Sequence, residues 1–166
     1  MSKNFVAVLM GSKSDLPVME KTLAVLGDLG VPFEVKITSA HRTPEATHSY
    51  VKDAETRGCR VFICAAGLAA HLAGAVAGIT TRPVIGVPMN GALDGLDALL
   101  STVQMPGGVP VATVAIGSAG AKNAAYLAAQ ILGVADEAIA ERVKADRQAS
   151  AEAVMAADAE LQASLS

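Results

Sequence analysis

The chain has 166 residues, a length that suits one domain with a sizeable hydrophobic core. Apolar residues make up 52% of it and charged residues 17%, so long disordered stretches are not expected. A net charge of −3, with 3% aromatic residues and no Trp, argues against electrostatic binding of nucleic acid and against base-stacking platforms.

The first predicted strand, residues 5–10, is a continuous apolar run typical of a strand buried on both faces. It leads into Gly11-Ser12-Lys13-Ser14-Asp15, where Asp15 is placed to cap the first helix. Ser12 and Ser14 supply hydroxyl groups beside the free N–H groups of that helix. This arrangement suits phosphate, and Asp15 suits ribose hydroxyls. A plain Ser/Asp-capped turn is the alternative, since the loop is neither a Walker loop nor a dinucleotide Gly-x-Gly-x-x-Gly motif.

The second predicted strand, residues 33–38, ends at Ser39-Ala40-His41-Arg42-Thr43-Pro44, whose last two residues begin the second helix. A titratable His41 beside the fixed cation Arg42 suits acid–base chemistry on an anionic substrate. The guanidinium can bind a phosphate through a forked pair of hydrogen bonds. The alternative for this loop is a solvated pair of polar side chains without a ligand. His48, in the second helix, is expected to be an ordinary surface residue.

The third predicted strand, residues 60–66, runs into the loop Gly67-Leu68-Ala69-Ala70-His71. Small residues at Gly67, Ala69 and Ala70 let the backbone approach a ligand closely, although tight packing of a helix on the sheet is the alternative. His71 opens the third helix. It is expected either to bind or tune the site, or to serve as a structural or interface histidine.

The remaining chain continues the alternation of strand and helix. Two segments without Asp, Glu, Lys or Arg, residues 61–81 and 98–121, contain Gly residues or a Pro-Gly turn and fit buried strand–turn–helix pieces better than membrane spans. Five strands with intervening helices predict a three-layer α/β sandwich with a parallel sheet. We expect the flavodoxin-like strand order 2-1-3-4-5, with the first and third loops at the topological switch point. Further strands are predicted over 83–87 and 110–116, and further helices over 94–103 and 118–132.

The tail, residues 135–166, has no Gly or Pro and is mostly Ala, Glu, Asp, Lys and Arg. About 28 helical residues would span roughly 42 Å at 1.5 Å per residue, farther than a domain of this size reaches. We therefore divide the chain into an α/β catalytic domain, residues 1–134, and a C-terminal helical arm, residues 135–166, for oligomer contacts. A frayed surface tail is the alternative.

Cysteine and histidine spacing bears on redox state and metal binding. Cys59 and Cys64 do not form a Cys-x-x-Cys pair, and five residues apart on one strand they are expected to face opposite sides of the sheet. Reduced thiols in the cytoplasm are expected, and the start of the chain does not read as a secretory signal. His41, His48 and His71 lack zinc-type spacing, so no metal is expected.

Four motifs together resemble one enzyme family. They are Gly11-Ser12-Lys13-Ser14-Asp15, Ser39-Ala40-His41-Arg42-Thr43-Pro44, Ala69-Ala70-His71-Leu72 and Val103-Gln104-Met105-Pro106. In this order, over roughly residues 5–135, they are similar to the class I N5-carboxyaminoimidazole ribonucleotide mutases, the PurE family of purine biosynthesis. Arg42 matches the mutases, since the related class that carboxylates aminoimidazole ribonucleotide directly tends to carry Lys there. Leu68 and Ala73 depart from the family pattern, which often has Gly and Pro at these positions.

The resemblance implies an isomerase that moves a carboxyl group from the exocyclic nitrogen of an imidazole ribonucleotide to a ring carbon. Trapped carbon dioxide is the intermediate, no cofactor is needed, and His41 serves as acid and then as base. The resemblance also implies a homo-octamer, with the C-terminal helix on another subunit and the loop 104–106 at a neighbour's site. The predicted substrate-binding residues are Ser12, Ser14, Asp15, Ser39, Arg42, Gly67, Ala69, Ala70 and His71.

Two alternatives are a direct carboxylase with the same fold and a flavodoxin-like binding or regulatory module. A flavin binder would offer aromatic side chains over the ring, and this chain has few. A phosphorylated receiver would carry a carboxylate cluster at its strand ends, yet the first three strands run into Gly11, Ser39 and Ala66. The binding or regulatory module is therefore the weaker of the two alternatives.

Overall fold

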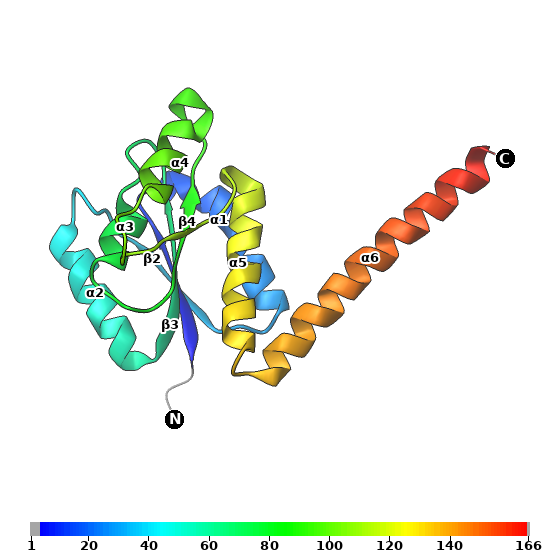
Figure 1. Ribbon diagram of the computed structural model, residues 1–166, viewed down its shortest axis with the longest axis horizontal. Coiled ribbons are helices and arrows are strands. Elements are labelled where there is room, and N and C mark those ends of the chain that lie inside the picture. Colours follow the sequence, from blue (N-terminus) through cyan, green and yellow to red (C-terminus); the bar gives the residue numbers. More distant parts are fainter. Residues whose placement is uncertain (1–3, 166) are drawn as a thin grey trace.

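A five-stranded parallel β-sheet forms the centre of the computed structural model, which describes residues 4–165 (Figure 1). The strand order β2-β1-β3-β4-β5 confirms the prediction, and each neighbouring pair runs parallel. The winding changes direction between β1 and β3, so the loops that follow these two strands diverge and leave room for a ligand. The strands are β1 (Phe5–Met10), β2 (Phe33–Ile37), β3 (Cys59–Ala66), β4 (Val84–Pro88) and β5 (Ala112–Thr113).

Helices cover both faces of the sheet, which confirms the three-layer sandwich (Figure 1). One layer consists of α1 (Leu16–Asp28) and α5 (Gly117–Gly133). The other contains α2 (Pro44–Arg57) and α3 (Leu72–Ala77), while α4 (Leu96–Val103) packs against β4. Each face of the sheet has its own apolar cluster, so the core is divided into two parts by the strands.

Strand β1 is buried on both faces, as its apolar run predicts. Val6, Val8 and Met10 belong to the cluster under α1 and α5, whereas Ala7 and Leu9 belong to the cluster under α2 and α3. All five side chains have 0% exposure. Each larger side chain contributes roughly 1.5–3 kcal/mol by its burial. Such a strand leaves no place for polar chemistry along its length, and polar groups can lie only beyond its ends.

The two cysteines face the same side of the sheet, which corrects the expectation that they face opposite sides. Cys59 and Cys64 both belong to the apolar cluster under α2 and α3. The physical reason is an irregularity in the register, because Phe5 pairs with Cys59 but Val6 pairs with Val61. One extra residue in β3 reverses the alternation of its side chains. Both thiols are free and buried, and burial raises the pKa of Cys59 to about 11.

Two elements differ from their predicted bounds. Strand β5 is only two residues long, because it follows Pro110, which has no backbone N–H, and lies at the edge of the sheet. The helix predicted over 94–103 begins instead with a 3₁₀ turn at Ala92–Gly95. In that turn Leu93 and Asp94 have φ values of 54° and 53°, the left-handed region that non-glycine residues seldom adopt.

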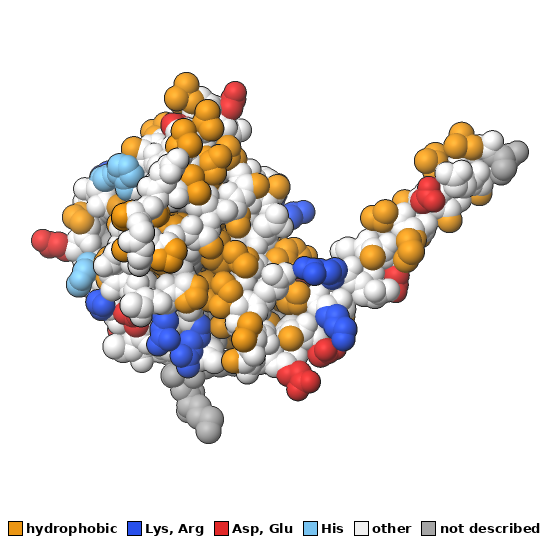
Figure 2. Space-filling view, viewed as in Figure 1, with side chains coloured by type: hydrophobic (Ala, Val, Ile, Leu, Met, Phe, Trp, Pro, Cys, Tyr) orange, Lys and Arg blue, Asp and Glu red, His pale blue; other side chains and the backbone are white. Residues whose placement is uncertain are grey.

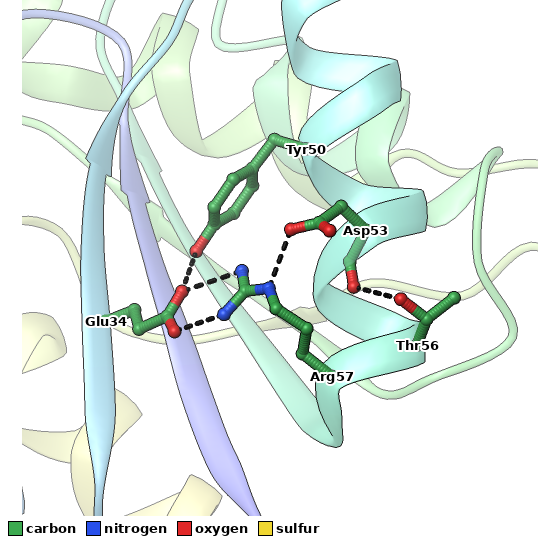
Figure 3. A network of polar contacts seen from close by, with 5 residues as sticks. All are labelled: Glu34, Tyr50, Asp53, Thr56 and Arg57. Carbon is green, nitrogen blue, oxygen red and sulfur yellow. Dashed lines mark hydrogen bonds and ion pairs between the residues drawn. The ribbon is translucent and has the colours of Figure 1, made fainter. Parts of the chain in front are cut away.

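A polar network joins the C-terminal end of α2 to β2 (Figure 3). The guanidinium of Arg57 donates to both carboxylate oxygens of Glu34 and, through Nε, to Asp53 Oδ2 at 2.6 Å. Tyr50 Oη donates to Glu34 Oε2 at 3.2 Å. The hydrogen bonds from Arg57 lower the pKa of Glu34, while burial and the nearby Glu34 charge raise the pKa of Tyr50. The network fixes the C-terminal end of α2 against β2. The N-terminal end of the same helix directly follows the loop that carries His41 and Arg42.

Helix α6 (Glu137–Leu165) extends away from the domain, which confirms the long C-terminal helix (Figure 1). Ile139 and Val143 in its first turns are buried against the domain. Beyond them, Val154 and Met155 are 70% and 61% exposed. The division into a catalytic domain and an oligomer arm stays a prediction. Among residues 4–165, no helix has both the length and the apolar character needed to cross a membrane.

Two helical glycines offer a matched test of packing. A Cβ added to Gly120 in α5 would overlap the backbone carbonyl of Ala115, whereas one added to Gly27 in α1 has no neighbour within 4 Å. We expect Gly120→Ala to lower the free energy of unfolding by about 3 kcal/mol or more, because backbone must move. Gly27→Ala should raise it by about 0.5–1 kcal/mol. Urea denaturation followed by circular dichroism measures both, and equal stability of the two variants would contradict the close approach.

Candidate active site

A cavity of about 500 Å³ opens at the carboxyl edge of the sheet, where the loops after β1, β2, β3 and β4 meet. These are the loops at and beside the topological switch point. Every predicted site residue except Ala70 lines the cavity. The predicted residues in its lining are Ser12, Ser14, Asp15, Ser39, His41, Arg42, Gly67, Ala69 and His71.

The loop after β1 folds into a compact 3₁₀ turn, residues Lys13–Asp15. Ser12 Oγ accepts hydrogen bonds from the backbone N–H and the hydroxyl of Ser14, at 3.3 and 2.9 Å. Asp15 Oδ2 accepts from the N–H of Ser12 at 3.0 Å. Asp15 therefore reaches back to Ser12 instead of capping α1 with its side chain, which differs from the sequence expectation. Burial raises the pKa of Asp15, an effect that the Ser12 hydrogen bond partly opposes.

The loop after β2 carries His41 and Arg42 and is tied to the first loop. One terminal nitrogen of Arg42 donates to the Gly11 carbonyl at 3.0 Å. The backbone N–H of Arg42 donates to Ser39 Oγ at 3.1 Å. Among residues 4–165 no carboxylate forms an ion pair with Arg42. The guanidinium is thus held beside Ser12 while most of its N–H groups remain available to an anion.

Three threonines support this loop on its buried side, and of these the sequence pointed only to Thr43, as the residue that caps the second helix. Thr38 and Thr47, 4% and 1% exposed, share a hydrogen bond between their hydroxyl groups of 2.7 Å. Thr43 Oγ1 accepts from the N–H of Ser39 at 2.9 Å, and the backbone N–H of Thr43 donates to the Ser39 carbonyl at 2.9 Å. Thr43 therefore braces the turn before α2 but does not cap the helix with its side chain. Buried hydrogen bonds of this kind fix a loop's conformation.

His41 and His71 are in direct contact across the second and third loops. Nε2 of His41 lies 2.8 Å from Nδ1 of His71, and the rings are close to perpendicular, at 87°. Such a hydrogen bond needs one donor and one acceptor, so it is compatible with at most one imidazolium in the pair. Within residues 4–165, Nδ1 of His41 makes no hydrogen bond. Nδ1 of His41 and, on the other ring, Nε2 of His71 are the nitrogens left for a bound molecule.

The loop after β3 has an unusual backbone. Leu68 has a φ of 56°, which a glycine adopts at lower cost, and its side chain is 60% exposed. This is one of the two positions at which the chain departs from the resemblance described above. Ala70 is 1% exposed and lies outside the lining, so its side chain is directed into the packed interior. Its neighbours Ala69 and His71 are exposed at the cavity.

A fourth wall, Met89, Asn90 and Gly91, was missed from the sequence. These residues follow β4, which lies beside β3, so the rule that ligands bind beyond strand carboxyl ends could have found them. Asn90 is exposed and brings an amide to the site. The loop 104–106 does not line this cavity of its own chain.

The arrangement favours organic acid–base chemistry on an anion. Within the described residues no group of three or more His, Cys, Asp or Glu side chains is placed to hold a metal ion. His48 lies outside the cavity and lines a separate small hollow beside α2. What converges on the cavity is a histidine pair, one arginine, three serines and one carboxylate. Such a set can anchor a phosphorylated molecule and move a proton at one point on it.

Comparison with known proteins identifies the family of the chain. The family model of AIR carboxylase matches residues 5–153. A Mycobacterium tuberculosis protein named N5-carboxyaminoimidazole ribonucleotide mutase is 55% identical over 158 residues, 95% of this chain and 90% of the relative. The protein of that name from Bacillus subtilis is 51% identical, over 90% and 93% of the two chains.

Solved structures give the same answer for the fold. The crystal structure of PurE from Treponema denticola matches with a TM-score of 0.86 and 34% identity, over 95% of this chain and 98% of that chain. A serine-to-aspartate variant of Treponema denticola PurE2 matches with a TM-score of 0.88 and 32% identity, over 96% and 98% of the two chains. On its sequence and its fold, the chain belongs to the AIR carboxylase family and, within it, to the PurE proteins.

Proposed function

We propose that the protein is an N5-carboxyaminoimidazole ribonucleotide mutase, an isomerase of purine biosynthesis. The observation that carries the proposal is the cavity in which the His41–His71 pair faces the anion-binding set of Arg42 and Ser12. Relatives that bear this enzyme's name are 51–56% identical over most of the chain. The product is 4-carboxy-5-aminoimidazole ribonucleotide, and the protein needs no cofactor for this reaction.

The first and second loops would hold the ribonucleotide. Arg42 and the hydroxyl groups of Ser12 and Ser14 bind the phosphate, because a guanidinium and adjacent hydroxyls together supply charge and directed donors. Asp15 accepts hydrogen bonds from the ribose hydroxyls. Ser39 begins the second loop, lines the cavity and supplies a third hydroxyl group to its polar side. The imidazole ring would then point toward the histidine pair, which joins the second and third loops.

In the proposed reaction His41 serves first as an acid. The bond between the exocyclic nitrogen and the carboxyl carbon breaks, carbon dioxide forms, and the nitrogen takes a proton from His41. The ring carbon, made nucleophilic by the adjacent amine, then attacks the carbon dioxide. The proton that this carbon carried returns to His41, so the enzyme ends as it began. His71 holds the Nε2 side of the His41 ring, and we assign the transfer to Nδ1.

Carbon dioxide must stay near the ring between the two steps, because it offers little to hydrogen bonding. A small apolar pocket retains it by proximity. The best wall is the segment 66–69, with Met89 behind it. A Cβ added to Gly67 would lie 3.5 Å from the Met89 side chain, so these two loops are in close contact. Gly67 thus lets the wall approach the ring.

We further propose a cytoplasmic homo-octamer in which α6 lies on a neighbouring subunit. Large apolar side chains of α6 beyond its first turns have no cover within the described chain. The exposed ones are Val154, Met155, Leu161 and Leu165, between 54% and 74% exposed. A helix with such a face is stabilised mainly by packing against a partner. The loop 104–106, which does not line its own cavity, would complete a neighbour's site.

Replacing His41 by Asn tests the acid–base role. We expect His41→Asn to lower kcat by at least about 10²–10⁴-fold, the usual contribution of a general acid or base, while ribonucleotide affinity is kept. Spectrophotometric turnover assays and calorimetric titration of the product measure the two quantities. His48→Asn is the matched control, since it makes the same change outside the cavity, and it should leave both unchanged. Full activity in His41→Asn would refute the mechanism.

His71→Asn separates orientation from proton transfer in the same assays. Because His71 contacts His41 and not the transferred proton, the variant should retain measurable turnover and show a displaced pH–rate profile. If the pH–rate profile of His71→Asn were identical to that of the unaltered protein, His71 would have no role in the mechanism.

An isotope experiment distinguishes the mutase from a direct carboxylase. The direct carboxylase is the second candidate function, because the matching family model is that of AIR carboxylase. Substrate with a ¹³C-labelled carbamate is converted in excess unlabelled bicarbonate, and the product is analysed by mass spectrometry. We expect most of the label in the product, because trapped carbon dioxide reacts before it escapes. Complete dilution of the label would favour direct carboxylation.

Charging the exposed face of α6 tests the oligomer. We expect the double variant Val154→Glu/Leu161→Glu to sediment as a smaller species than the unaltered protein, because buried charge opposes association. Gln162→Glu adds charge at a polar position of the same helix and should leave the assembly intact. Sedimentation velocity measures the mass, and an octamer that survives the double variant would contradict the proposed role of α6.

A further inference from the structure

A second cavity, of about 710 Å³, lies at the opposite edge of the sheet from the candidate active site. Its walls come from the amino-terminal starts of β1 to β4 and from the junction of α5 and α6. Figure 2 shows Lys and Arg side chains gathered on this side of the domain, near the N-terminal end of the chain. The polar side chains that matter to its chemistry are Asn4, Arg60, Thr81, Arg82, Asp136 and Arg142.

Two of the arginines are held in place by neutral partners. Arg60 Nε donates to Asn4 Oδ1 at 2.8 Å, and Arg142 Nε donates to the Leu29 carbonyl at 2.6 Å. The Arg142 guanidinium also lies over Gly30, where an added Cβ would be 3.4 Å from its Nε. In each case the hydrogen bond uses Nε and leaves the terminal N–H groups for another acceptor.

None of these arginines has a carboxylate partner among residues 4–165. Arg60, Arg82 and Arg142 are absent from every ion pair of that part of the chain, whereas Arg57 pairs with both Glu34 and Asp53. The carboxylate that lines the cavity, Asp136, accepts a hydrogen bond from the Ile139 N–H. Three guanidinium groups thus face one carboxylate, in a protein whose net charge is −3.

We propose that this cavity is a second anion site, which binds a small phosphorylated molecule. Guanidinium groups bind phosphate oxygens in forked pairs, and three of them around one cavity suit more than a single phosphate group. The volume is that of a site for a small molecule. The site is distinct from the candidate active site, since β1, six residues long, separates the two edges by roughly 20 Å at about 3.3 Å per residue.

A ligand there would also bridge two parts of the fold. Arg142 and Asp136 belong to the start of α6 and the turn before it, whereas Arg60 and Arg82 belong to the starts of β3 and β4. An anion bound by Arg142 on one side and by Arg60 or Arg82 on the other would tie the base of α6 to the sheet. Because a ligand that binds only the folded state stabilises it, binding should raise the midpoint of thermal unfolding.

The test uses inorganic pyrophosphate as the probe, titrated calorimetrically into the full-length protein in magnesium-free buffer at 0.15 M salt. We expect Arg82→Gln and Arg60→Gln each to weaken binding at this site by about ten-fold, the effect of one lost charged hydrogen bond. Arg82→Lys keeps the positive charge but loses the forked pair of hydrogen bonds, so its affinity for pyrophosphate should lie between those of the unaltered protein and Arg82→Gln. Arg147→Gln, on α6 outside this cavity, is the matched control and should bind as the unaltered protein does.

Arg42→Gln distinguishes this site from the candidate active site. Pyrophosphate binding that is unchanged in Arg42→Gln but about ten-fold weaker in Arg82→Gln supports the proposal, as does a thermal shift with the same pattern. Catalytic turnover should be unchanged in Arg82→Gln, so failure of the anion site and failure of the mutase assignment are separate results. Three results would overturn the proposal. They are no pyrophosphate binding by the unaltered protein, loss of pyrophosphate affinity in Arg42→Gln alone, and an equal loss of affinity in Arg147→Gln and Arg82→Gln.

Discussion

The burial of β1 and β3 on both faces is the constraint on which the rest of the structure depends. Val8 and Leu9 of β1, and Phe62 and Ile63 of β3, have no exposed surface. A polar or charged side chain at these positions would be costly without partners, so every reactive group is displaced beyond the strand ends. Parallel pairing then brings the ends of different strands to one edge. The same burial that stabilises the sheet therefore concentrates the polar loops in one cavity.

The fold and much of the site were predictable because their signals are local. An apolar run predicts a buried strand, and a strand followed by His41 and Arg42 predicts polar groups at the carboxyl edge. The contact between His41 and His71 was not predictable in this way, because it joins residues 30 apart through the packing of two loops. The orientation of the Ala70 side chain was also not predictable from the sequence, since neighbouring residues in a tight turn alternate between cavity and core.

The second loop is held from two directions, which explains how an exposed histidine can keep a defined position. Below it, the buried hydroxyl groups of Thr38 and Thr47 are joined at 2.7 Å. At the far end of α2, the Arg57–Glu34 pair fastens the helix to β2 (Figure 3). An exposed ion pair contributes little stability by itself. Its effect here is geometric, because a rotation of α2 would move the loop that carries His41.

The cavity of a single chain is open, whereas the proposed reaction must keep carbon dioxide from escaping. The loops that form its rim also expose apolar side chains, with Leu68 at 60% and Leu93, shortly after Gly91, at 74%. Both residues have left-handed backbones, and such a conformation costs a non-glycine residue about 1–2 kcal/mol. Exposed apolar surface and a strained backbone in the same rim are unfavourable in an isolated chain. Cover by a neighbouring subunit would bury the exposed apolar side chains, offset the backbone strain and close the pocket. The proposed assembly and the proposed reaction would therefore place the same demand on these loops.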